Sequence, residues 1–117
     1  MRLLGIAGAD TAAGYRRLLQ ARVDLSEMAV SRTRTVTWHA VHDFQAWVTA
    51  AEETDPGCDD EWQAGLSREA AHAEVLFLGS MAPSLQLEVR RQSQARLTGC
   101  DTMTGFTDSR AVGRSSL

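Results

Sequence analysis

Two histidine spacings in this chain could bind a metal ion. Glu69 and His72 form a Glu-x-x-His step, which on a helix places a carboxylate and an imidazole on one face, as in di-iron helical bundles. His39 and His42 repeat the i, i+3 spacing. If both pairs lay on helices, these four side chains would suit a small metal-dependent enzyme.

Di-iron bundles repeat the Glu-x-x-His step and add glutamates from other helices, whereas this sequence contains one such step. Histidines on the surface, or hydrogen-bonded within a core, are the simpler interpretation. We therefore expect no metal and no other cofactor, and the His/Glu enzyme is the alternative hypothesis.

A second candidate site is the acidic segment between residues 52 and 61. It carries six carboxylates: Glu52, Glu53, Asp55, Asp59, Asp60 and Glu61. The D-x-D-x-D-G spacing of a calcium loop is absent. The simplest interpretation is a solvated turn with helix caps. The functional alternative is a partner-binding surface that docks onto an Arg-rich or nucleic-acid-binding protein, because complementary charge favours such encounters.

Other catalytic signatures are missing from the sequence. All 12 basic residues are Arg, so a Schiff-base lysine or a P-loop lysine is impossible. The glycines at positions 5 and 8 do not form a G-x-G-x-x-G motif, and no serine lies in a G-x-S-x-G motif. We therefore expect a non-catalytic protein.

Length and charge limit the architecture and the partners. A chain of 117 residues with 44% hydrophobic residues indicates one domain. We place this domain at residues 1–97, followed by an irregular tail at residues 98–117 that is flexible or ordered by a partner. The net charge of −3 argues against direct binding of nucleic acid or of an anionic membrane.

Composition also indicates the cellular setting. Lys and Asn are absent and Ile6 is the single isoleucine, a bias that AT-poor codons produce and that indicates a high-GC bacterial genome. No apolar run approaches the ~20 residues of a membrane span, and the apolar start is too short for a signal peptide. With two cysteines, free thiols in the cytoplasm are expected.

The segment at residues 35–53 is expected to organise the fold. Its β-branched start suits a strand, and Phe44, Trp47 and Val48 then fall at helical spacing on one apolar stripe. The sequence therefore predicts a strand followed by a helix, with these three side chains in the core. Trp47→Ala is accordingly expected to destabilise the protein.

The remaining elements complete an α+β prediction. We expect a short strand or arm at residues 2–7, a helix from Asp10 or Thr11 to about Arg22, and a helix from residue 59 or 60 into the run at residues 75–78, with Ser67 as a possible second cap. A small sheet would pair residues 32–38 with residues 84–91, although a helix at residues 84–97 is the open alternative. About three helices and a small sheet result.

These features favour a small protein-interaction module. It would be either a self-assembling subunit, whose edge strand pairs with another copy, or an inhibitor that docks on a larger complex. The helix–strand–helix pattern expected over residues 14–53 is similar to small phage head–tail joining proteins, which implies an origin in a phage or another mobile element. The sequence leaves the partner and the oligomeric state open.

Overall fold

The computed structural model describes residues 1–101, without the side chains of Ala51 and Glu52. The chain divides into two compact units, Met1–Gln63 and Ala64–Leu117; among the described residues, the first unit has two strand pairs and the second has one. Three α-helices and three two-stranded sheets form within the described residues. The expected mixed α+β class is therefore confirmed.

The first unit begins with a parallel strand pair and its connecting helix. β1 (Gly5–Gly8), the 3-10 turn η1 (Ala9–Thr11), α1 (Ala12–Gln20) and β2 (Met28–Ser31) follow in order. β1 and β2 pair in parallel, which requires a crossover such as α1. Ala7 and Val23 are buried here. The predicted first strand and first helix thus form, each within a few residues of its expected bounds.

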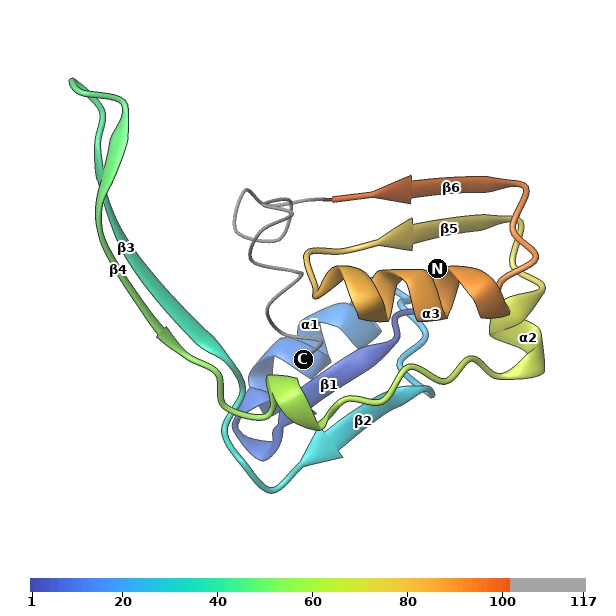
Figure 1. The fold of residues 1–117 in the computed structure, drawn as a ribbon. Coiled ribbons are helices and arrows are strands. Elements are labelled where there is room, and N and C mark those ends of the chain that lie inside the picture. The colour runs from blue at the N-terminus through green and yellow to red at the C-terminus, as the bar shows by residue number, and fades with distance from the viewer. Residues whose placement is uncertain (102–117) are drawn as a thin grey trace. The chain divides into compact units, whose positions relative to one another are not determined.

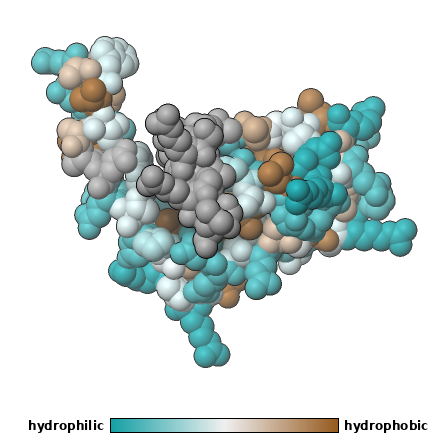
Figure 2. All heavy atoms as spheres, in the orientation of Figure 1, coloured by the Kyte–Doolittle hydropathy of each residue, from teal (hydrophilic) through white to brown (hydrophobic). Residues whose placement is uncertain are grey.

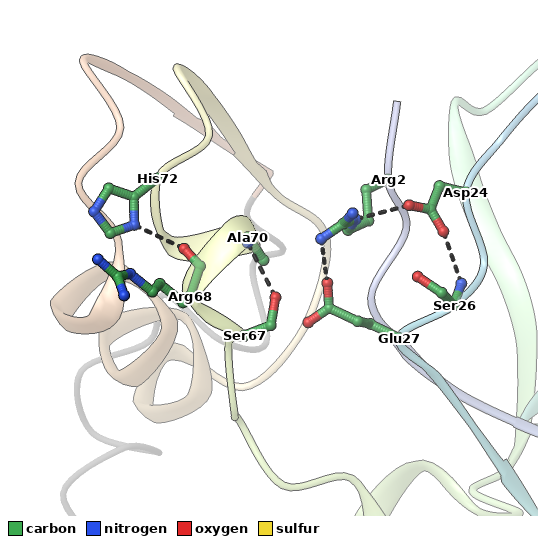
Figure 3. Close-up of polar contacts among 8 residues, drawn as sticks. All are labelled: Arg2, Asp24, Ser26, Glu27, Ser67, Arg68, Ala70 and His72. Carbon is green, nitrogen blue, oxygen red and sulfur yellow. Dashed lines mark hydrogen bonds and ion pairs between the residues drawn. The ribbon is translucent and has the colours of Figure 1, made fainter.

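An ion-pair cluster joins the N-terminal residues of this unit to the segment between α1 and β2 (Figure 3). The Arg2 Nε lies 2.9 Å from the Asp24 Oδ2, and the Arg2 Nη1 lies 2.8 Å from the Glu27 Oε2. The backbone N–H of Ser26 donates to the Asp24 Oδ1 at 2.9 Å. Hydrogen bonds from Ser26, and then from Arg2, lower the pKa of Asp24 to about 2.

Asp24 should therefore make folding stability acid-sensitive. The pKa is lower in the folded chain than the ordinary value of about 3.9, so its stabilisation is present above about pH 4 and is lost as the pH falls towards 2. Urea unfolding should show that Asp24→Asn is less stable than the wild type near neutral pH, and that the difference shrinks at about pH 2. A constant difference would contradict this role.

The segment at residues 35–53 forms a β-hairpin, so the predicted strand-then-helix is wrong. β3 (Thr37–Asp43) pairs antiparallel with β4 (Val48–Asp55), with a bulge between Val41 and His42. Figure 1 shows the two strands as a long ribbon in turquoise and green. The turn is stabilised by Asp43, whose Oδ1 accepts the backbone N–H groups of Gln45 and Ala46 at 2.9 and 3.0 Å.

Two further predictions, which involve the same segment, are also wrong. Residues 32–36 connect β2 to β3 and are not the predicted strand, and the helix–strand–helix pattern that resembled phage head–tail joining proteins is not formed. Phe44 and Trp47 are 76% and 87% exposed, so neither belongs to a core. Their apolar surface needs another explanation.

The second unit is a parallel strand pair with two helices. It comprises α2 (Arg68–Ala71), β5 (Val75–Leu78), α3 (Pro83–Gln92) and β6 (Leu97–Cys100). β5 and β6 pair in parallel. Leu78 and Val89 are buried.

Several predicted bounds change in this part of the chain. Instead of one helix after residue 59, there is the 3-10 turn η2 (Asp59–Glu61), then α2, then the strand β5. The predicted cap at Ser67 is confirmed, because its Oγ accepts the Ala70 N–H at 3.1 Å. The predicted strand at residues 84–91 is wrong and its helical alternative is right, since Pro83 begins α3 at the position where proline favours a helix start.

The predicted tail falls only partly within the described residues. β6 continues an ordered strand past residue 97 to Cys100, because its pairing with β5 satisfies the backbone. Residues 102–117, which include most of the expected tail, lie outside the described residues. Within residues 1–101, helices are too short or too polar to cross a bilayer, and Cys58 and Cys100 are free thiols.

Candidate association surface

The β3–β4 hairpin is anchored to β1 by one polar cluster. The Gly8 N–H donates to the Thr35 Oγ1 at 2.8 Å. The Thr35 hydroxyl in turn donates to the Asp10 Oδ1 at 2.6 Å, and the Thr35 N–H donates to the same oxygen at 3.1 Å. These bonds, led by that of the hydroxyl, lower the pKa of Asp10. The chain entering β3 is therefore fixed by both its backbone and its side chain.

The chain leaving β4 is fixed against the same segment. The Cys58 N–H donates to the Arg34 carbonyl oxygen at 2.8 Å, and the Arg34 Nη2 lies 2.5 Å from the Asp55 Oδ2. Gly57 has a φ of +51°, and a Cβ there would overlap the Arg34 carbonyl oxygen. Both ends of the hairpin thus meet at a closely packed root, in which Cys58 is 1% exposed.

Above this root the hairpin exposes a set of large apolar side chains, which we call the hairpin patch. Its members are Trp38, Val41, Phe44, Trp47 and Val48, which are 54%, 61%, 76%, 87% and 54% exposed. In the space-filling view the hairpin, at upper left, shows brown and pale residues among teal ones (Figure 2). Large apolar side chains that are exposed on both faces of one hairpin are more typical of an interaction site than single scattered ones.

One face of the hairpin holds a row of rings. The His42 ring lies between those of Trp38 and Phe44, with centroid separations of 6.2 Å to each. Thr49, the cross-strand partner of His42, has its Oγ1 3.2 Å from the His42 Nδ1. This bond and the two ring contacts fix how the rings lie on this face of the hairpin.

Trp47 occupies an unfavourable backbone conformation at the tip of the hairpin. Its φ is +54°, in the left-handed region that a bulky side chain adopts at a cost of roughly 1–2 kcal/mol. Its side chain gains little in the single chain, because it is 87% exposed. A strained and exposed tryptophan supports a role in contact with another surface.

The acidic segment is not one open surface. Asp55 pairs with Arg34, and Glu61 accepts the hydroxyl groups of Ser31 and Thr33 at 2.6 and 2.8 Å. These two bonds lower the pKa of Glu61, with that of Ser31 the stronger. Of the six predicted partner-binding residues, Glu53, Asp59, Asp60 and Glu61 are exposed, although Glu61 is already bonded, and the side chain of Glu52 lies outside the described part of the structure.

The four residues of the alternative metal hypothesis do not all lie on the elements that it assumed. His39 and His42 lie on a strand, where i, i+3 residues point to opposite faces, and not on the helix that the prediction assumed. Glu69 and His72 lie at α2, where the His72 Nδ1 is 2.7 Å from the Arg68 carbonyl oxygen (Figure 3). Residues 1–101 contain no group of three or more His, Cys, Asp or Glu side chains that could hold a metal ion.

Comparison with known proteins shows a fold but no family. No protein-family model and no curated protein matches the sequence. Among solved structures, the chain is similar to the nucleoside kinase of Methanocaldococcus jannaschii, an archaeal member of the ribokinase family, with a TM-score of 0.63 and 17% identity over 86% of this chain. The match covers 34% of that kinase, so the chain spans about a third of its length. At this identity the similarity concerns the fold alone.

Proposed function

We propose that this chain is a self-associating module whose interface is the β3–β4 hairpin. The observation that carries the proposal is the hairpin patch, whose apolar and aromatic side chains lie on the two strands and their turn and are each more than half exposed. Covering each of its large side chains would contribute roughly 1.5–3 kcal/mol before the costs of association. Trp and other aromatic residues are also the usual anchors of protein interfaces.

The strand pairing supports the same proposal. Within the described residues β3 pairs only with β4, so both outer edges of the hairpin present unpaired backbone groups. A lone two-stranded hairpin is marginally stable in water, and open edges readily accept further strands. Pairing one edge with the hairpin of a second copy would satisfy the backbone groups of that edge and place apolar side chains of the two copies side by side.

Sedimentation equilibrium of the full chain tests the proposal. The wild type should form a dimer or larger oligomer at micromolar concentration, and Trp38→Ser should weaken association about tenfold. Leu87→Gln is the matched control, because Leu87 is 57% exposed on α3 and should not affect association. A monomeric wild type, or equal effects of the two substitutions, would refute the hairpin interface.

We also propose a docking role for the acidic segment and a bacterial setting for the protein. Docking on a larger complex as an inhibitor would use Asp59 and Asp60, and charge reversal at both should then weaken capture of that complex. Cytoplasmic function in a high-GC bacterium or its mobile elements fits the free thiols and the arginine-only composition. Self-association through the hairpin requires neither inhibitor docking nor a particular cellular setting.

Nucleoside binding is a second candidate function. The observation that favours it is the backbone similarity to a nucleoside kinase over 86% of this chain. Isothermal titration calorimetry with adenosine, guanosine, cytidine and uridine tests it directly. Saturable heat with one of them would support this function, and no heat at millimolar nucleoside would count against it.

A further inference from the structure

The extended segment that leads into α2 is held by one side chain of α3. Residues 62–67 form neither a helix nor a strand. The Gln92 Nε2 donates to the Ala64 carbonyl oxygen at 3.0 Å, and the Gln92 Oε1 accepts the Leu66 N–H at 2.9 Å. In the described part of the chain, these two bonds are the hydrogen bonds of residues 64–66, which we call the strap.

The two bonds reproduce the contact that a neighbouring strand would make. In a parallel strand pair, a residue donates its N–H to one carbonyl group of the partner strand and accepts the N–H that lies two residues further on. The Gln92 amide makes both bonds across Gly65. A reversed amide would set its NH2 group against an N–H and its oxygen against a carbonyl oxygen. The side chain therefore takes the place of a strand that the strap lacks.

The Gln92 amide is itself oriented by its own helix. Its Nε2 also donates to the Glu88 Oε1 at 3.2 Å, and Glu88 lies one helical turn earlier on the same face of α3. The Glu88 Oε2 in turn lies 3.7 Å from the Arg91 Nη1. Both donors and the acceptor of the amide are thus in use, so that α3 presents the amide to the strap in one orientation.

Side-chain packing adds little to the attachment of the strap. A Cβ at Gly65 would have no described atom within 4 Å apart from its chain neighbours. Ala64 and Leu66 are half-buried, and Gly65 is exposed. A segment with few buried apolar contacts and few hydrogen bonds opens locally at a lower free energy than the unit to which it belongs.

We propose that Gln92 controls a local opening of the strap, in which residues 64–66 leave α3 while the rest of their unit stays folded. This inference is independent of self-association, which concerns the hairpin at residues 37–55. In the open state, water would take over the Ala64 carbonyl group and the Leu66 N–H. Loss of both bonds should raise the open population by about tenfold or more.

Residue-resolved hydrogen exchange, followed by NMR on the full chain, tests this inference. In the wild type, the Leu66 amide should be protected, whereas the Gly65 amide, which makes no hydrogen bond within the described residues, should exchange freely. Gln92→Ala should speed exchange at Leu66 by about tenfold or more. The amide of Val89, within α3, should keep its protection.

Gln86→Ala is the matched control, because it removes the same side chain from the same helix. The Gln86 Nε2 donates to the carbonyl oxygens of Gly79 and Asp101, at 2.9 and 2.8 Å, and does not bond to the strap. This variant should leave exchange at Leu66 unchanged.

Three results would overturn the inference, and none of them affects the hairpin interface. Equal protection of Leu66 and Gly65 in the wild type would show that the strap is not held by Gln92, even if the variant does not fold. Equal acceleration at Leu66 and Val89 in Gln92→Ala would show that the side chain supports the whole unit and not a local opening. Faster exchange at Leu66 in Gln86→Ala would show that the effect is not specific to the strap.

Discussion

Gly8→Ala is expected to destabilise the first unit by roughly 3 kcal/mol or more. Gly8 ends β1 beside the hairpin root. A Cβ at this position would overlap the Thr33 carbonyl oxygen, and it would lie 2.5 Å from the Thr35 nitrogen and 2.7 Å from the Arg34 carbonyl carbon. All three atoms belong to the backbone, so the neighbouring chain must move. Such movement would also break the bond from the Gly8 N–H to Thr35.

Urea unfolding followed by tryptophan fluorescence would measure this loss. Gly14→Ala is the control, because Gly14 lies in α1 and, apart from its own helix, no residue in the described part of the chain comes within 4 Å of the position that a methyl group would take. Alanine should stabilise a helix there by roughly 0.5–1 kcal/mol. The two glycine-to-alanine changes thus have opposite expected signs. Equal stability of Gly8→Ala and wild type would mean that the root is not packed as described.

Elements controlled by local chemistry were predictable from the sequence. The cap at Ser67 depends on residues within one turn of each other and forms as predicted. The predicted helix after Asp10 also forms, although neither Asp10 nor Thr11 caps it, because Thr11 makes no side-chain cap bond and Asp10 bonds to Thr35. The sequence favoured a strand at residues 84–91 and offered the helix at residues 84–97 only as the alternative. Pro83 could have decided between them, because proline favours the first turn of a helix. The α+β class required no more than these local features.

The hairpin was missed because its register joins residues as far apart in the sequence as Thr37 and Asp55, whereas a helix joins residues within one turn. Phe44, Trp47 and Val48 match a helical stripe, but Phe44 and Trp47 lie in a turn and Val48 begins β4. The β-branched residues Thr37, Val41 and Thr49 were signals for strands, and Asp43 before a turn was a signal for a hairpin. The helical spacing extended from Val41 to Ala51, yet these two residues are register partners across the two strands, which spacing along the chain does not reveal.

The anchoring contacts could not have been predicted from spacing. Glu61 bonds to Ser31 and Thr33, and Thr35 bonds to Asp10 and Gly8, from distant parts of the chain. An acidic segment therefore looks like one surface in the sequence although some of its carboxylates serve the fold. The association surface was equally hidden, because exposure of a tryptophan depends on which strand covers it.

Trp47→Gly should change stability and association in opposite directions. Glycine adopts a φ of +54° without the steric cost that tryptophan bears, so the single chain should gain roughly 1 kcal/mol in its free energy of unfolding. The same substitution removes the most exposed member of the hairpin patch. Loss of an aromatic anchor should weaken association by about 3 kcal/mol, or on the order of 100-fold in the dissociation constant.

Both quantities can be measured on one protein, by urea unfolding at a concentration where the chain is monomeric and by sedimentation equilibrium. Ala46→Gly is the control in the same turn, because it removes no large side chain and should leave association unchanged. If Trp47→Gly lowered the stability of the monomer, Trp47 would be packing within its own chain. If it raised stability but left affinity unchanged, the strained tryptophan would have no part in the interface. Only a gain in one measurement together with a loss in the other fits a residue that is held in strain for a partner.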